Sequence, residues 1–178
     1  MASILYITQI HIEPGALKRL AEECQKHRIT RPLVVTDTGI KAAGLLQQAL
    51  DALPGVVCSV FDATPSNPTE AAVRAATDLC HENKCDGLIA IGGGSSMDCA
   101  KGVGARVARP HKTIPQMRGL LRVGKKLPLL IAIPTTAGTG SECQSAALIA
   151  DEAEPLVHAQ RADCPCHQYC PSPAIRPS

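Results

Sequence analysis

The sequence of 178 residues predicts an α/β fold, in which a parallel sheet has helices on both faces. Short apolar runs of strand length alternate along the chain with longer segments of helical periodicity, as in the crossover units that join parallel strands. Apolar residues make up 45% of the chain, which has two Tyr, one Phe and no Trp. Small branched side chains of this kind suit helices packed on a sheet.

Five strands are expected where apolar, mainly β-branched residues are bounded by turn-forming residues. They cover residues 3–8, 33–36, 56–61, 88–91 and 127–133. Parallel strands end at one edge of their sheet, so the loops that follow different strands meet there and form ligand sites.

Four helices are expected between these strands. The first begins near Pro14 and is followed by apolar residues at helical spacing, and the second covers 42–53. The third begins at Asn67-Pro68-Thr69-Glu70, a capping-box pattern with Asn67 as the N-cap, and runs to about residue 83. The fourth covers 96 to about 108. The segment 109–126, rich in basic residues with prolines and glycines, is expected to be an irregular surface excursion.

Composition excludes several classes of function. A net charge of +2 and so few aromatic residues give no phosphate-tracking surface and no stacking platform, so nucleic acid is not an expected partner. No apolar run reaches the roughly 18 to 20 residues needed to cross a bilayer, and the amino-terminal residues do not resemble a signal peptide. We therefore expect no membrane association, a cytoplasmic location, and the nine cysteines mostly as small buried residues.

A glycine-rich turn, Gly92-Gly93-Gly94-Ser95-Ser96-Met97-Asp98, directly follows the strand 88–91 and opens a helix. Glycines let the backbone approach a ligand closely, and the free N–H groups at a helix start attract phosphate, so the turn predicts a diphosphate site. The pattern is not G-x-G-x-x-G, because Met97 stands where the third glycine would be. The alternative is a plain turn in which Ser95 is the N-cap and Asp98 the reciprocal acid of a capping box.

A second polar loop, residues 134–142, follows the strand 127–133. Its threonines, serine and glycines make a flexible loop with donors for phosphate or ribose oxygens. By itself it is equally an ordinary Ser/Thr turn. Two such loops at the ends of two strands of one sheet favour the ligand site.

The runs 89–101 and 131–142 together resemble the amino-terminal dinucleotide-binding domain of the iron-containing, group III alcohol dehydrogenases. The runs 34–40 and 60–62 support the resemblance, which extends over roughly residues 12 to 151. It implies a Rossmann-like parallel sheet. The related dehydroquinate synthases also have a triple-glycine turn, but their second loop ends in Ser-Ser-Val-Gly-Gly-Lys, which this chain lacks.

The resemblance also implies a set of cofactor contacts. Asp37 would accept a hydrogen bond from the adenosine ribose, and its charge favours NAD over NADP, although it is also suited to the turn before Gly39. The glycine-rich turn would line the diphosphate through Gly93, Gly94, Ser95 and Asp98. The second loop would cover the cofactor through Thr135, Thr136 and Thr139, and Asn67 would contact the adenosine half.

In this family a second, all-helical domain holds iron or zinc, which acts as a Lewis acid on the alcohol oxygen. Its ligands belong to a motif resembling Gly-x-Asp-Ala-x-x-His-Ala, and no residue here matches it, so we expect no metal or catalytic residue in this chain. Asp163 and His167 stand four apart, but Pro165 between them is unsuited to a helix. The cysteines at 164–170 are too crowded for the usual zinc pattern.

Composition changes abruptly after Asp151. We expect a dinucleotide-binding domain over 1–151 and an irregular tail over 152–178, disordered or read in a different frame from a longer enzyme. The resemblance predicts NAD-dependent interconversion of a small alcohol and its aldehyde or ketone, with this chain truncated to the cofactor-binding part and inactive alone. It is compatible with a homo-oligomer. The alternative is a non-catalytic nucleotide-binding module or an unstable fragment.

Overall fold

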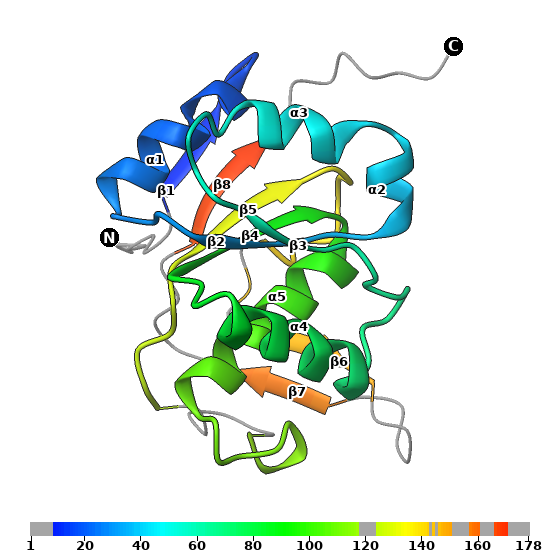
Figure 1. Cartoon of the computed structure of the whole chain (residues 1–178). Coiled ribbons are helices and arrows are strands. Elements are labelled where there is room, and N and C mark those ends of the chain that lie inside the picture. Colours follow the sequence, from blue (N-terminus) through cyan, green and yellow to red (C-terminus); the bar gives the residue numbers. More distant parts are fainter. Residues whose placement is uncertain are drawn as a thin grey trace, which may run out of the picture.

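A parallel sheet lies at the centre of the computed structural model, which describes residues 9–117, 124–142, 144, 146–150, 157–160 and 166–170 (Figure 1). Within these residues the strand order is β1-β8-β5-β4-β2-β3, and every neighbouring pair is parallel. The strands are β1 (Gln9–Ile12), β2 (Pro32–Val35), β3 (Ser59–Phe61), β4 (Gly87–Gly92), β5 (Leu130–Pro134) and β8 (Cys166–Cys170). A separate antiparallel pair consists of β6 (Ala146–Ile149) and β7 (Val157–Gln160).

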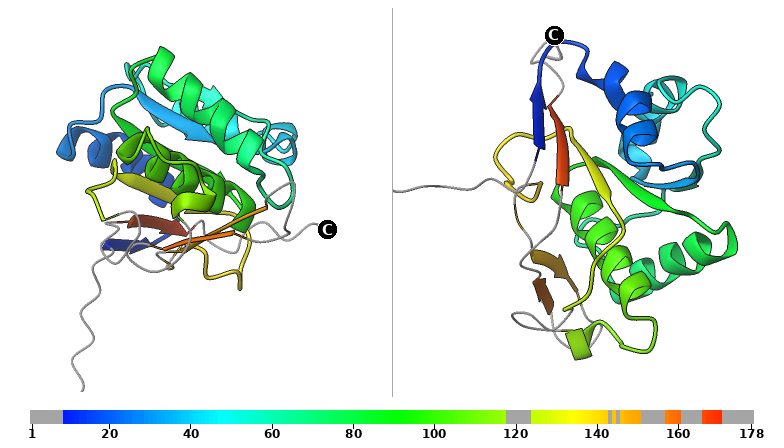
Figure 2. Two further views of the ribbon diagram at one scale, coloured as in Figure 1. Left: turned by 90° about the horizontal axis from the view of Figure 1, so that it is seen from below. Right: turned by 90° about the vertical axis from the view of Figure 1, so that its left-hand side faces the viewer.

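Helices cover both faces of this sheet (Figures 1 and 2). On one face lie the 3-10 turn η1 (Ala16–Arg19), α1 (Leu20–Lys26) and α3 (Leu45–Asp51), and on the other lie α4 (Glu70–Glu82) and α5 (Gly94–Ala108). The prediction of an α/β fold with helices on both faces is confirmed.

The strands divide their side chains between two cores, one on each face. Leu33 and Leu88 lie in the core with α4 and α5, and the residues that follow them, Val34 and Ile89, lie in the core with α1 and α3. Successive side chains of a strand point to opposite faces, so a strand covered on both sides must be apolar at every position. This is why these strands are continuous apolar runs in the sequence.

Two helices begin or end at residues that differ from the prediction. Residues 42–53 do not form one helix, because the chain bends at Gly44 between α2 (Thr38–Ala42) and α3. The N-cap of α4 is Thr69, whose Oγ1 accepts a hydrogen bond from the Ala72 amide at 3.2 Å, and the prediction of Asn67 as N-cap is wrong. Asn67 has a φ of +61°, which lies outside the conformation of an N-cap.

The segment 109–126 is only partly an excursion over the surface. Its described part contains the 3-10 turn η2 (Pro115–Met117), and the side chains of Ile114 and Met117 are 1% and 0% exposed. They pack in the core with α4 and α5, because apolar side chains gain free energy by leaving water even from an irregular segment.

The two ends of the chain differ from the prediction where they are described. The expected strand 3–8 lies outside the described residues, and β1 follows it. The irregular tail predicted over 152–178 contains two strands, β7 and β8, and the rest of it lies outside the described residues. β8 pairs with β5 on one side and β1 on the other, so it satisfies backbone groups that β5 would otherwise leave at an edge. In the described part of the chain, no helix is long and apolar enough to cross a membrane.

Candidate functional site

A crevice of the kind that holds ligands in open α/β sheets is expected where β2 and β4 end. From β2 the chain continues to β3 on one side, and from β4 it continues to β5 on the other side. Adjacent strands whose onward connections diverge leave a crevice beyond their carboxyl ends. Asp37 follows β2, and the turn Gly92–Gly94 follows β4. These predicted residues therefore lie at the carboxyl ends of the two strands, along the edge of the crevice, which we call the rim.

The turn after β4 leaves the start of α5 without a side-chain cap. The N-cap is Gly93, and within the described residues no side chain caps the backbone amides at this helix start. The alternative in which Ser95 and Asp98 form a capping box is therefore wrong. Uncapped N–H groups at a helix start, together with the positive end of the helix dipole, make a site for an anion.

Gly92 is required by the conformation of this turn. Its φ is +143°, and a Cβ at this position would lie 2.5 Å from Ser96 Oγ. Both the backbone angle and the space therefore exclude a side chain. Gly94 has a related role, because a Cβ there would lie 3.0 Å from Ser141 Oγ in the loop after β5. The absence of side chains lets the two loops approach each other.

Asp37 is held by two hydrogen bonds at the edge of the turn. Its Oδ1 accepts from the Ile40 amide at 2.9 Å, which makes it the N-cap of α2. Its Oδ2 accepts from Ser96 Oγ at 3.1 Å. The carboxylate is half-buried, and each oxygen keeps a second lone pair for a further donor. Its roles as turn residue and as candidate ribose acceptor are therefore compatible.

Two more backbone contacts bring the other predicted segments to the same place. The Asn67 amide donates to Ser95 Oγ at 3.2 Å, so the loop after β3 lies beside the first turn of α5. The Thr135 amide donates to the Gly92 carbonyl at 2.9 Å, which joins the loop after β5 to the turn after β4. Asn67, Ser95 and Thr135 thus belong to one rim, although they come from three separate parts of the chain.

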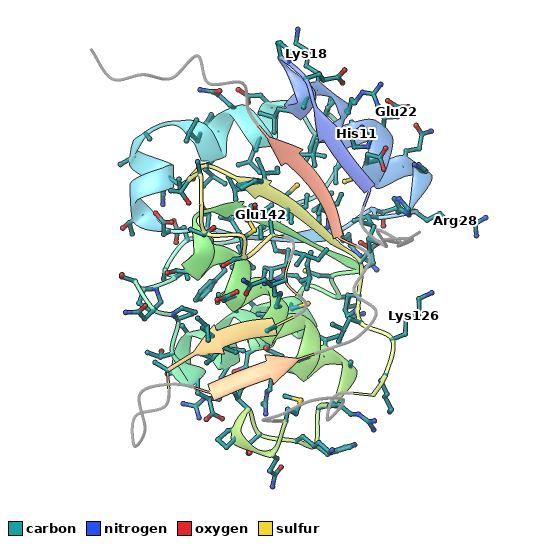
Figure 3. All side chains as sticks on the ribbon, turned by 180° about the vertical axis from the view of Figure 1, so that it is seen from behind. His11, Lys18, Glu22, Arg28, Lys126 and Glu142 are labelled. Atoms are coloured by element: carbon teal, nitrogen blue, oxygen red, sulfur yellow. The ribbon has the colours of Figure 1, made fainter. Side chains whose placement is uncertain are left out.

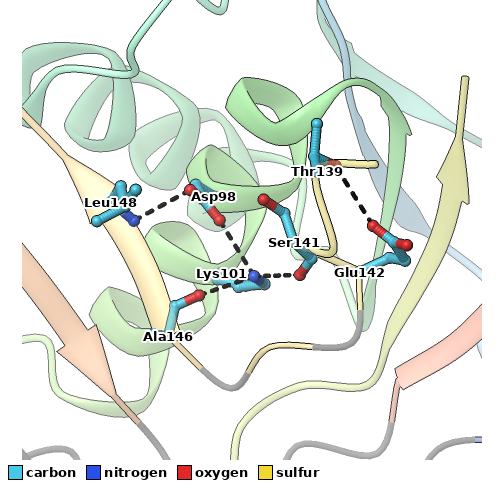
Figure 4. Close-up of polar contacts among 7 residues, drawn as sticks. All are labelled: Asp98, Lys101, Thr139, Ser141, Glu142, Ala146 and Leu148. Carbon is cyan, nitrogen blue, oxygen red and sulfur yellow. Dashed lines mark hydrogen bonds and ion pairs between the residues drawn. The ribbon is translucent and has the colours of Figure 1, made fainter. Parts of the chain in front are cut away.

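The hydroxyl groups of the loop after β5 lie near or at the surface. Thr136 and Thr139 are exposed and Thr135 is half-buried. The Thr139 hydroxyl donates to Glu142 Oε2 at 3.5 Å (Figure 4). A Cβ at Gly93 would lie 3.2 Å from Thr136 Oγ1, so this hydroxyl is adjacent to the uncapped helix start.

Asp98 is the one predicted contact that lies apart from this rim. Its side chain is 8% exposed, and its carboxylate oxygens accept from Lys101 Nζ and from the Leu148 amide, each at 3.1 Å (Figure 4). The side chain is directed to β6 and not to the uncapped amides. Sequence reasoning missed Lys101, although a Lys three residues after an Asp in a helix expected to be buried is a recognisable signal for an ion pair.

An ion pair joins the segments that follow β2 and β3. Lys41 Nζ on α2 donates to Asp62 Oδ2, just beyond β3, at 2.5 Å. The hydrogen bond from Lys41 holds the pKa of the Asp62 carboxyl below its usual value. Asp62 is therefore a carboxylate at neutral pH, and it ties α2 to the loop after β3.

Comparison with known proteins identifies the family. Residues 8–166 match the family described as "Iron-containing alcohol dehydrogenase". The chain belongs to the iron-containing alcohol dehydrogenase family. Over 152 residues it is 48% identical to 4-hydroxybutyrate dehydrogenase of Cupriavidus necator, and over 141 residues it is 34% identical to NAD-dependent methanol dehydrogenase of Bacillus methanolicus. These alignments cover 84% and 78% of this chain but only 40% and 37% of the two relatives.

The fold of this iron-containing alcohol dehydrogenase family member agrees with solved structures. It superimposes on the crystal structure of a 1,3-propanediol oxidoreductase with a TM-score of 0.86 and 27% sequence identity. The superposition covers 92% of this chain and 44% of that protein. The chain therefore spans less than half the length of the relatives that it matches.

The metal that the family name implies does not fit the part of the chain that the structure describes. Among those residues, no three His, Cys, Asp or Glu side chains are grouped so as to hold a metal ion.

Proposed function

We propose that this chain binds NAD and forms the cofactor-binding part of an alcohol dehydrogenase that interconverts a small alcohol and its carbonyl compound. The observation that supports the proposal is the uncapped start of α5 in the crevice between β2 and β4. Gly93, Gly94 and Ser95 place three successive backbone amides there, and a diphosphate supplies the anionic oxygens that such amides bind.

The loop after β5 would cover the diphosphate from the other side. The Thr135 amide is bonded to the turn, the Thr136 hydroxyl lies beside Gly93, and Thr139 lies further along the same loop. Hydroxyl groups donate to phosphate and ribose oxygens and also accept from ribose hydroxyls, so they suit either part of the cofactor. Asn67, fixed beside Ser95, would contact the cofactor from the loop after β3.

Asp37 would select the cofactor by its charge. A half-buried carboxylate at the end of β2 accepts hydrogen bonds from ribose hydroxyls and repels a 2′-phosphate. NAD is therefore the preferred dinucleotide. This agrees with the "NAD-dependent" name of the Bacillus methanolicus relative. When bound, NAD supplies the hydride acceptor, and the residues of this chain hold and orient it.

A second interpretation is a nucleotide-binding module that does not turn over alcohol by itself. It is favoured by the sequence, because no residue matches the metal-ligand motif that the family resemblance implies. Both interpretations require the same binding site, and they differ only in the reaction.

Binding is tested with the purified chain, NAD+ and two fragments of it. We expect NAD+ and ADP-ribose, which retain the diphosphate, to raise the melting temperature, and adenosine, which lacks it, to have little effect. Ligand at about one hundred times its Kd stabilises a folded protein by about 2.7 kcal/mol. No shift with either diphosphate ligand would refute the proposal.

Turnover is tested separately, with NAD+, added iron(II) or zinc, and 4-hydroxybutyrate or methanol. The module interpretation predicts binding without NADH formation. Alcohol-dependent NADH formation would overturn it and establish the chain as an enzyme.

A further inference from the structure

We propose that Lys101 is a positioning residue for the cofactor: it holds the loop after β5 against α5, so that the threonine hydroxyls face the uncapped helix start. This inference rests on the proposed function. It also assigns Asp98 to the same structural pair instead of to a direct cofactor contact.

The Lys101 ammonium is buried and fully hydrogen-bonded. Its Nζ donates to Asp98 Oδ1 at 3.1 Å, to the Ser141 carbonyl at 2.5 Å and to the Ala146 carbonyl at 2.8 Å (Figure 4). The side chain is 6% exposed. An ammonium has three donors, so each of them is used. A buried charge is tolerated in this way only if every partner stays in place.

These partners join α5 to both ends of one connecting segment. The Ser141 carbonyl stands where the loop after β5 ends, and the Ala146 carbonyl stands where β6 begins. Asp98 fixes β6 at another point, because its Oδ2 accepts from the Leu148 amide at 3.1 Å. The pair of Asp98 and Lys101 therefore fastens the segment 141–148 to the first half of α5.

The loop is consequently held at its two ends and has little regular structure between them. At the near end the Thr135 amide donates to the Gly92 carbonyl at 2.9 Å, and at the far end Lys101 holds Ser141. Gly138 and Gly140 between these points have φ angles of +90° and +64°. Backbone with two such residues is not kept in one conformation by local preference, so its position depends on the two attachments.

The far attachment also sets the distance between the loop and the diphosphate site. A Cβ at Gly94 would lie 3.0 Å from Ser141 Oγ, so Ser141 is in close contact with the first turn of α5. If Lys101 released the Ser141 carbonyl, this part of the loop would be free to move away from the helix start. The hydroxyl groups would then no longer be oriented before the cofactor binds, and ordering them would weaken binding.

The test compares Lys101→Met with Lys126→Met. Lys126 is an exposed lysine that projects from the fold (Figure 3), so its replacement controls for the loss of a positive charge. Affinities for NAD+ and for 5′-AMP are measured by calorimetry, because AMP retains the adenosine and one phosphate of the cofactor but lacks the second phosphate and the nicotinamide ribose. We expect Lys101→Met to weaken NAD+ binding by about tenfold or more, as for the loss of one charge-assisted hydrogen bond, and to weaken AMP binding by a clearly smaller factor.

A purely structural role would give a different result. It would lower the affinity for NAD+ and AMP by the same factor, or change neither, and either outcome overturns the proposal. If Lys101→Met does not fold, the double variant Asp98→Asn with Lys101→Met removes both buried charges. The side-chain amide oxygen introduced at position 98 still accepts from the Leu148 amide. We again expect the affinity for NAD+ to fall more than the affinity for AMP.

Hydrogen exchange separates this inference from the proposed function. Amides 136–142 should exchange faster in Lys101→Met than in the wild type, whereas amides 38–43 in and after α2 should not change. If the wild type binds no NAD+, the proposed function fails, and the exchange measurement still decides whether Lys101 holds the loop. Unchanged exchange at 136–142 would refute that role.

Discussion

The Ser96 hydroxyl donates to Asp37 Oδ2 at 3.1 Å, although the two residues stand 59 positions apart in the chain. Ser96 is completely buried in α5, and Asp37 ends the loop that leaves β2. This hydrogen bond joins the ends of the two strands between which the crevice opens. It also orients the carboxylate that we propose as the ribose acceptor, so the geometry of the site does not depend on the loop of Asp37 alone.

Replacing Asp37 by Asn should change cofactor preference with little loss of stability. Asn is as good an N-cap as Asp, so the hydrogen bond from the Ile40 amide is retained, but the charge that repels a 2′-phosphate is removed. We expect the ratio of the Kd for NADP+ to that for NAD+ to fall by about tenfold, which is the effect of about 1.4 kcal/mol. An unchanged ratio, measured by calorimetry, would remove the proposed role of Asp37.

Replacing Gly92 by Ala should damage both the fold and the site. The new Cβ would lie 2.5 Å from Ser96 Oγ and 3.2 Å from Asp37 Oδ2, at a φ of +143°. We expect a loss of about 2 to 4 kcal/mol in the free energy of unfolding, the sum of backbone strain and overpacking. Gly55→Ala is the control, because Gly55 has a φ of +76° with no atom within 4 Å of a Cβ. It should lose only about 1 kcal/mol in urea unfolding. Equal losses would show that the contact with Ser96 is unimportant.

Two glycines of α5 should respond differently to Ala. A Cβ at Gly102 would lie 2.7 Å from Ile149 Cδ1 and 2.9 Å from Val73 Cγ2, whereas at Gly104 its nearest neighbour would be Leu88 Cδ1 at 3.3 Å. Both substitutions gain about 1 kcal/mol of helix propensity, so the difference between them reports packing. Gly102→Ala should be less stable than Gly104→Ala by about 1 to 3 kcal/mol in thermal unfolding. A smaller difference would mean that Val73 on α4 and Ile149 on β6 move aside at little cost in free energy.

Asp86 should stabilise the fold at neutral pH and lose this effect in acid. Its carboxylate accepts from Thr30 Oγ1 at 2.6 Å and from the Arg31 amide at 2.9 Å, which ties the start of β2 to that of β4. Partial burial raises the pKa of Asp86, but the hydrogen bonds from Thr30 and Arg31 outweigh it and hold that pKa below its ordinary value. The stabilisation is therefore complete above about pH 4 and is lost as the pH falls through the lower pKa of the folded state.

The measurement is urea unfolding of the wild type and Asp86→Ala from neutral pH into acid. At pH 7 we expect the variant to be less stable by about 0.5 to 1 kcal/mol, since Asp86 is exposed and water screens its contacts, and the difference should shrink below about pH 4. Asp78→Ala is the matched control, since Asp78 is exposed on α4 and should show no such difference. A difference between wild type and Asp86→Ala that stays constant into acid would contradict this account.

The candidate site could be placed from the sequence because its segments follow strands. Asp37, Gly93 and Thr135 are far apart in the chain, yet each comes directly after a predicted parallel strand, and parallel strands end at one edge. The direction of the Asp98 side chain could not be predicted in this way. It depends on what packs against each face of α5, and the Leu148 amide that it meets belongs to a later segment.

The first residue of α4 shows the same limit. The pattern beginning at Asn67 is a good capping box, but the backbone there is fixed by distant residues. The Glu70 amide donates to the Ala150 carbonyl at 3.1 Å, and the Ala150 amide donates to the Pro68 carbonyl at 2.8 Å. These bonds hold Thr69 extended against Ala150, so the helix begins only at Glu70. Hydrogen bonds formed by tertiary contact outweigh the few tenths of a kcal/mol that distinguish one cap from another.

The sequence by itself determined the α/β class, the two polar loops and the edge of the sheet at which they meet, because these follow from hydrophobic periodicity and the direction of parallel strands. Tertiary structure alone decided that Asp98 turns away from the candidate diphosphate site and that Lys101 holds the loop opposite it. The reason is that a buried charge takes the position where all its partners are satisfied, and here the partners come from α5, the loop after β5 and β6 together.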